Sequence, residues 1–136
     1  MLNMFETENK RLVRNYFEEV TNQGDLEAIS KYIATDFVDH DAPSGLMMGI
    51  EGVRETITLL RTAFPDFHAT IEDIIAEGDK VVVRNIWHGT HQGSFLNMSP
   101  TGKQVTMKGI VIWRIQDGKI VERWATIDRS QVFEVK

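Results

Sequence analysis

The chain has 136 residues, 42% of them hydrophobic and 26% charged, which suits a single globular domain spanning residues 1–136. Its net charge of -5 and the lack of a basic run argue against nucleic acid or an anionic membrane as a partner. Without cysteine, a recognisable signal peptide or a membrane-length apolar run, it is expected to be a cytoplasmic protein with no disulfides.

The first half of the chain predicts three helices. Apolar side chains recur at helical spacing over residues 6–21, and Gly24 is a plausible C-cap for that helix. Asp25 can cap a short second helix, and a third is expected over residues 50–64. Between the last two, residues 36–41 predict a short strand that runs into a turn at Pro43-Ser-Gly45.

The remainder predicts strands. They are expected over residues 67–77, 80–91, 105–116 and 119–128, with a long connection over 92–103 and a short tail over 129–136. Asp117-Gly118 between two apolar runs indicates a two-residue hairpin turn. The expected fold is therefore α+β: three N-terminal helices packed on a curved, mainly antiparallel sheet that forms a cone with an internal cavity.

The two-residue turn predicts the register of the last hairpin. Val111 would pair with Trp124 and Met107 with Asp128, which places Asp128 at the end of a mostly apolar face. A lone carboxyl group in such surroundings is expected to have a raised pKa. We therefore predict Asp128 as an acid/base group in the cavity and Trp124 as its apolar wall and N–H donor. The alternative is an Asp128 that caps the strand or pairs with an arginine.

Short motifs follow one another along the chain in an informative order. They are Asn22-Gln-Gly-Asp-Leu26, Asp39-His-Asp41, Phe64-Pro-Asp66, Gly78-Asp-Lys-Val81, Arg84, Gly89-Thr-His-Gln-Gly93, Pro100-Thr-Gly102, Gly118-Lys-Ile-Val-Glu122, Trp124 and Asp128. This order resembles the SnoaL-like polyketide cyclase family of the nuclear transport factor 2-like superfamily. The resemblance implies an α+β cone, a homodimer through the open sheet face, no cofactor, and aldol ring closure by an aspartate at the position of Asp128.

Four further residues are candidates for the site. Strand alternation puts His40 on the opposite side from Asp41. If His40 faces inward, it contacts a substrate carbonyl or holds Asp128; if Asp41 faces inward, it is a second acid; the structural alternative is a solvated strand end or a helix-capping network. Arg84, a lone charge in an apolar strand, would bind a substrate oxygen or pair with an acid. His88 could reach the cavity mouth. His88 and His91 point to opposite faces of their strand, so no metal site is expected.

The related ketosteroid isomerases offer a contrast. Their two oxyanion donors fall on Phe17 and Val111, which cannot donate a hydrogen bond and are expected only to line the site. The expected function is a cofactor-independent acid/base enzyme that cyclises or isomerises a small apolar carbonyl compound. The alternatives are a non-catalytic binding protein of the same fold, or an epoxide-hydrolase-like enzyme using Asp128 with Arg84.

The outer face of the hairpin is expected to form the homodimer contact. It would carry an apolar stripe edged with charge, a composition that suits an interface better than a catalytic site. The residues expected on this face are Lys108, Ile110, Ile112, Arg114 and Arg123.

Overall fold

The structure is a computed structural model that describes residues 4–42 and 48–130. Its elements are, in chain order, α1 (Met4–Tyr16), η1 (Phe17–Asn22), η2 (Leu26–Ala28), α2 (Ile29–Tyr32), β1 (Ile33–Asp39), α3 (Gly49–Ala63), β2 (His68–Glu77), β3 (Lys80–Thr90), β4 (Gln104–Gln116) and β5 (Lys119–Asp128). The predicted turn at 43–45 and residues 131–136 of the predicted tail lie outside the described residues.

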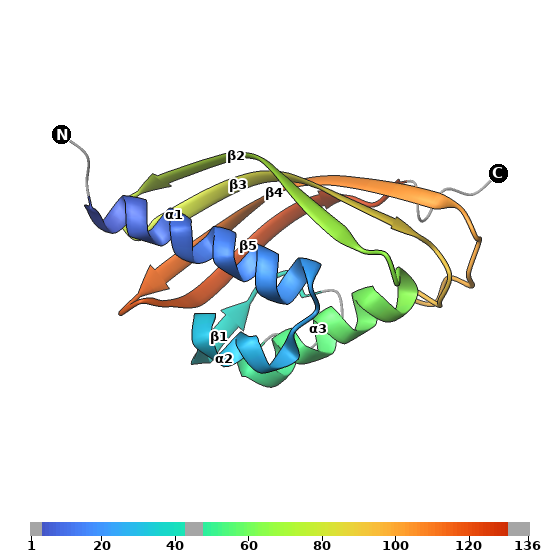
Figure 1. Cartoon of the computed structure of the whole chain (residues 1–136), viewed down its shortest axis with the longest axis horizontal. Helices are drawn as coiled ribbons and strands as arrows, with labels where there is room; N and C mark the ends of the chain where they lie inside the picture. The colour runs from blue at the N-terminus through green and yellow to red at the C-terminus, as the bar shows by residue number, and fades with distance from the viewer. Residues whose placement is uncertain (1–3, 43–47, 131–136) are drawn as a thin grey trace.

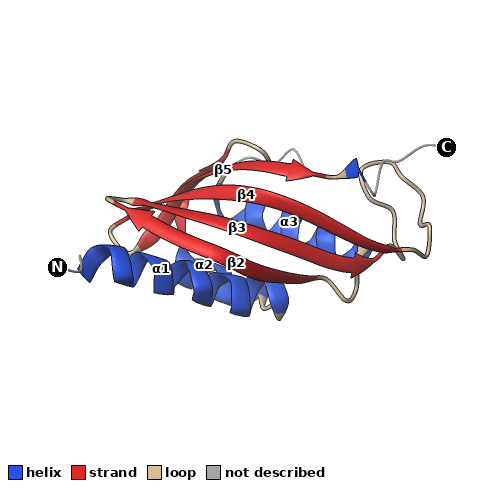
Figure 2. Cartoon of the chain, turned by 90° about the horizontal axis from the view of Figure 1, so that it is seen from above, coloured by secondary structure: helices blue, strands red, loops and turns tan. Residues whose placement is uncertain are grey.

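The five strands form one open, mixed sheet in the order β1-β5-β4-β3-β2. The β1–β5 pair is parallel and the other pairs are antiparallel. Helices α1, α2 and α3 lie on one side of the sheet (Figure 1), and the view from above shows the strands in front of α3 (Figure 2). The predicted α+β class is confirmed. No helix within 4–42 and 48–130 is long and apolar enough to span a bilayer.

The structure has the expected glycine cap after the first helix and the expected aspartate cap before the second. Gly24 has a φ of 72°, and its N–H donates to the Val20 carbonyl at 3.1 Å, as a glycine C-cap does. The Asp25 carboxylate accepts the Glu27 N–H at 3.1 Å, which satisfies an N–H group at the start of η2. The first helix is longer than its α-helical part, because η1 continues α1 with π-helical hydrogen bonding.

The core lies between the helices and the inner face of the sheet. Residues 81, 83, 85 and 87 of β3 are buried and alternate with more exposed neighbours. Val53 and Ile57 of α3 and Val13 and Tyr16 of α1 supply buried side chains from the helical layer. Because of this alternation, only the odd-numbered side chains from 81 to 87 of β3 point toward an interior site.

The hairpin between β4 and β5 begins as predicted. Asp117 and Gly118 both have positive φ, 51° and 73°, which a type I′ turn requires. Ile115 pairs with Ile120, but the next pair is Arg114 with Glu122. Val121 therefore has no partner on β4 and forms a β-bulge.

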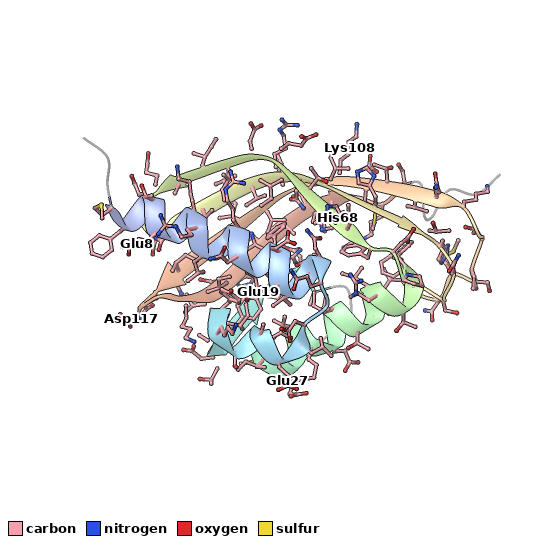
Figure 3. All side chains as sticks on the ribbon, viewed as in Figure 1. Glu8, Glu19, Glu27, His68, Lys108 and Asp117 are labelled. Carbon is pink, nitrogen blue, oxygen red and sulfur yellow. The ribbon has the colours of Figure 1, made fainter. Side chains whose placement is uncertain are left out.

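The bulge makes the predicted register wrong beyond Val121. One extra residue shifts the pairing, so each later side chain of β5 lies on the face opposite to the one expected. Arg123 now pairs with buried Trp113 on the inner face, although it was expected outside. Asp128 pairs with Lys108 instead of Met107. Lys108 lies above the sheet, on the side away from the helices (Figure 3).

Candidate functional site

A buried ion pair joins the last residue of β1 to the inner face of β5. Asp39 and Arg123 are partners in the parallel ladder, and Arg123 Nη1 donates to both carboxylate oxygens of Asp39 at 3.1 Å. The two side chains are only 9% and 12% exposed. A charge-assisted pair away from water is stronger than a surface pair, and each charge depends on the other for compensation.

Aromatic side chains surround this ion pair. The Arg123 guanidinium lies 5.4 Å from the centre of the Trp113 ring, within cation–π range. Tyr16 packs edge-on against the same indole, with ring centres 5.4 Å apart. Burial raises the pKa of Tyr16, so its hydroxyl stays neutral and can donate. Trp113 Nε1 is buried and has no hydrogen-bond partner among the described residues.

Two small hollows lie between α3 and the sheet, and Arg123 lines both. Their volumes are about 40 and about 50 Å³. Both are lined by Thr56, Leu60, Trp87 and Arg123. The smaller is completed by Phe67, Phe95, Met107, Ile127 and Arg129. The larger is completed by Tyr16, Phe17, Thr21, Phe37, Asp39, Val53, Ile57 and Trp113. The interior is thus mostly apolar, with its charges concentrated around Arg123.

A family model matches nearly the whole of this chain. The SnoaL-like polyketide cyclase model aligns with residues 11–134. The chain belongs to the SnoaL-like polyketide cyclase family. The resemblance drawn from the motif order is therefore confirmed.

Several solved structures resemble this SnoaL-like chain over most of its length. A candidate polyketide cyclase from Acidithiobacillus ferrooxidans is 29% identical, with a TM-score of 0.82 over 98% of this chain and 96% of that chain. IdmH, a candidate polyketide cyclase from Streptomyces antibioticus, is 31% identical, with a TM-score of 0.79 over 91% and 94%. AclR, a candidate hydroxylase from Streptomyces galilaeus, is 27% identical, with a TM-score of 0.81 over 96% and 88%. No curated protein gave a match.

Asp128, the acid/base group expected in this SnoaL-like chain, lies on the outer face of the sheet and is exposed. Its carboxylate accepts the Ser130 backbone N–H at 2.9 Å. Hydrogen bonding to Ser130 holds the pKa of Asp128 below its ordinary value, with a smaller contribution from Lys108. The predicted raised pKa is wrong, because the bulge turns Asp128 away from the apolar interior.

Trp124 and His40 also lie outside the interior. Trp124 pairs with Ile112 on the outer face, and its ring stacks on that of His40 at 5.1 Å. His40 Nε2 lies 2.7 Å from a carboxylate oxygen of Glu122. Hydrogen bonds from Arg114 and then His40 keep the pKa of Glu122 low. The expected contact of Trp124 with Asp128 inside a cavity is therefore wrong.

The remaining predicted site residues are divided between the two faces. Arg84 is outside and binds Asp73, with a shortest distance of 2.6 Å, rather than Asp128. His88 is exposed, with Thr106 Oγ1 at 3.4 Å from Nδ1. Asp41 is exposed, and its carboxylate accepts the Ala125 N–H at 2.8 Å. Phe17 and Val111 are buried on the inner side, and Phe17 lines a hollow.

The interior instead holds Asp39, Arg123 and Arg129, none of which was predicted as a site residue. A signal for this was present beyond the bulge: Ala125 and Ile127 are apolar, whereas the even-numbered neighbours at 122, 126 and 128 are polar. That alternation favours an inward odd-numbered face. The part of the chain that the structure describes contains no group of three or more potential metal ligands.

Proposed function

We propose that this protein is a cofactor-independent acid/base enzyme that acts on a small apolar carbonyl compound, by aldol-type cyclisation or by isomerisation. The observation that carries the proposal is the buried Asp39–Arg123 pair, in which Arg123 lines both hollows and Asp39 lines the larger one. Membership of the SnoaL-like polyketide cyclase family supports the reaction class. In this proposal Asp39 takes the role that the sequence predicted for Asp128.

The chemistry follows from the two groups. The Asp39 carboxylate would accept a proton from the carbon next to a substrate carbonyl. The electron pair of that C–H bond passes to the carbonyl oxygen, and a guanidinium can stabilise the resulting enolate. Arg123 uses one of its nitrogens for Asp39, which leaves further N–H donors for the substrate. In an aldol closure the enolate carbon attacks a second carbonyl, and Asp39 returns the proton to the alkoxide formed.

The size of the hollows adds a requirement. Small-molecule pockets usually measure roughly 300 Å³ or more. Hollows of about 40 and about 50 Å³ are well below that value. Substrate entry in this proposal therefore requires the layer of α3, which contributes Thr56 and Leu60 to both hollows, to separate from the sheet.

The test measures proton transfer without requiring the natural substrate. 1-Tetralone exchanges the hydrogens next to its carbonyl slowly in D2O, and an enzyme of the proposed kind should accelerate this exchange. We expect Asp39→Asn to reduce the exchange to the background rate and Asp128→Asn to retain it. Circular dichroism of both variants controls for folding. If Asp128→Asn lost the exchange and Asp39→Asn retained it, Asp128 would be the acid/base group and the proposal would be overturned. Saturable ligand binding without exchange in the wild type would favour the binding-protein alternative.

A second candidate is water activation of the epoxide-hydrolase type. Each hollow, at about 40 and about 50 Å³, exceeds the roughly 10–15 Å³ that a cavity needs to hold a water molecule. Asp39 would take a proton from a water molecule while Arg123 orients the carboxylate. The hydroxide would attack an epoxide carbon, the C–O bond would break, and Asp39 would return the proton to the alkoxide formed. This version replaces the Asp128–Arg84 pair considered from sequence, since Arg84 binds Asp73 instead. Incorporation of labelled oxygen from water into a product would favour the hydrolase over the cyclase.

A homodimer through the outer sheet face remains part of the proposal. Ile75 and Ile110, on the outer sides of β2 and β4, are 63% and 50% exposed. Covering such side chains would remove apolar surface from water. Sedimentation equilibrium of Ile110→Glu beside the wild type tests this expectation, because the introduced charge should shift the mass toward that of one chain.

A further inference from the structure

Arg129 is the first residue after β5, and the bulge directs it inward. It lines the smaller hollow together with Arg123 and the aromatic rings of Phe67, Trp87 and Phe95. The Arg129 side chain has no hydrogen bond or ion pair to any residue within 4–42 and 48–130. Half-burial of a guanidinium removes part of its hydration, and a protein seldom leaves such a charge without a partner.

The charges at this end of the interior do not balance. Arg123 and Arg129 supply two positive charges, and Asp39 supplies the buried negative one. Asp41 is exposed, and its carboxylate already accepts a backbone N–H. Burial and the nearby Arg123 lower the pKa of Arg129, while Asp41 opposes them. Arginine nonetheless remains protonated in proteins. The described residues that line the smaller hollow include these two guanidinium groups and no carboxylate, and Asp41 offsets Arg129 only from an exposed position, so the interior itself holds one more positive than negative charge.

We infer that the smaller hollow binds an apolar carboxylic acid in its ionised form, with the carboxylate between Arg129 and the unused donors of Arg123. The surplus of one positive charge matches a monoanion, and the forked guanidinium matches the two oxygens of a carboxylate. The aryl or alkyl part of the acid would pack on Phe67, Trp87 and Phe95 once α3 has separated from the sheet, because the closed hollow of about 40 Å³ is too small for it. This deepens the proposed function, on which it rests, because it narrows the substrate class from carbonyl compounds to those that carry a free acid rather than an ester.

The test compares two probes that differ only in charge. 2-Naphthoate and 2-naphthamide share one ring system, so their difference in affinity, measured by isothermal titration calorimetry with the full chain, reports on the carboxylate alone. We expect the acid to bind about tenfold more tightly than the amide. Arg129→Gln should abolish that preference, and Arg129→Lys should retain part of it. Arg84→Gln, which removes a guanidinium from the outer face, should leave the preference unchanged.

Several outcomes would overturn the inference: equal affinity for the two probes, no binding of the acid, or a preference that survives in Arg129→Gln. Partial retention in Arg129→Lys guards against a variant that merely misfolds, since both substitutions remove the same side chain. The result is independent of the proton-exchange test, because 1-tetralone has no carboxylate. If the protein binds the acid selectively but does not accelerate exchange, the anion site is supported and the catalytic proposal is wrong. If it accelerates exchange but does not prefer the acid, the catalytic proposal is supported and the anion site is wrong.

Discussion

Arg123 reaches Asp39 across the parallel β1–β5 pair because Val121 has no partner opposite it on β4. In a regular ladder, Glu122 rather than Arg123 would lie beside Trp113 on the inner face. Asp39 would then have an acidic neighbour in place of a guanidinium. The bulge thus determines the sign of the charge that β5 presents to the interior.

Removing Arg123 should destabilise the fold strongly. Arg123→Met leaves the buried Asp39 carboxylate uncompensated, and breaking a buried pair in this way costs about 3 kcal/mol or more of unfolding free energy. The double variant Asp39→Asn/Arg123→Met should recover much of that loss. Urea denaturation measures both. Arg84→Met, at the exposed pair with Asp73, should cost under about 1 kcal/mol. Equal costs at the two arginines would contradict the buried pair.

Gly109 should not tolerate a larger side chain. A Cβ there would lie 2.6 Å from the Thr126 carbonyl oxygen and 2.9 Å from the Trp87 ring. Gly109→Ala should therefore cost about 1–3 kcal/mol of unfolding free energy, since backbone or ring must move. Denaturant unfolding tests this against Lys108→Ala, on the exposed outer face of the same strand. A Gly109 variant as stable as the Lys108 variant would show that the two strands separate easily.

The two tyrosines should resist ionisation in the folded protein. Burial, followed by the hydrogen bond to Glu19, raises the pKa of Tyr32 to about 12, and burial raises the pKa of Tyr16 as well. A raised pKa gives stability that is complete below the unfolded value of about 10 and is lost as pH rises through the folded value. Tyrosinate absorbance should therefore appear at higher pH in native than in denatured protein. Tyr32→Phe should remove one of the two late transitions. Ionisation of both tyrosines near pH 10 in the native protein would contradict the burial of their hydroxyl groups.

Asp66 should contribute to stability on the acid side. The Thr90 backbone N–H at 2.7 Å, and then the Thr90 hydroxyl at 2.8 Å, hold the pKa of Asp66 below its ordinary value. A depressed pKa stabilises the fold above the unfolded value of about 3.9, and this contribution is lost as pH falls through the folded value. Asp66→Asn should make the acid-side decline in melting temperature shallower. Asp36→Asn, at an exposed position, is the matched control. An unchanged decline in Asp66→Asn would show that the hydrogen bonds to Thr90 do not persist in solution.

Local signals predicted much of the fold. The first helix, the cap at Asp25 and the turn at Asp117-Gly118 depend on neighbouring residues, and the structure has all three. Val111 precedes the bulge and is buried on the inner face of the sheet, and Phe17 is buried in the helical layer. Their predicted contact with a substrate stays a prediction.

The rest of the site depends on contacts between distant segments. Val121 lies between Ile120 and Glu122, with no glycine at the bulge itself, so the only local sign of it is the alternation beyond it at Ala125 and Ile127. Its consequence is the pairing of Arg123 with Asp39, 84 residues earlier in the chain. Regular alternation along β5 therefore predicts an inward Asp128 and an outward Arg123, whereas in the structure Asp128 lies outside and Arg123 inside.

The three tryptophans lie on both sides of the sheet, which makes the protein its own optical reporter. Trp87 and Trp113 are 7% and 4% exposed and face the interior, whereas Trp124 lies outside against His40. A soluble quencher such as iodide should reach Trp124 far more readily than the other two. With Trp124→Phe, the remaining emission would follow ligand entry alone. With Trp87 and Trp113 both replaced, the emission of Trp124 would report whether a second chain covers the outer face. Ligand binding and assembly can therefore be observed separately in one protein.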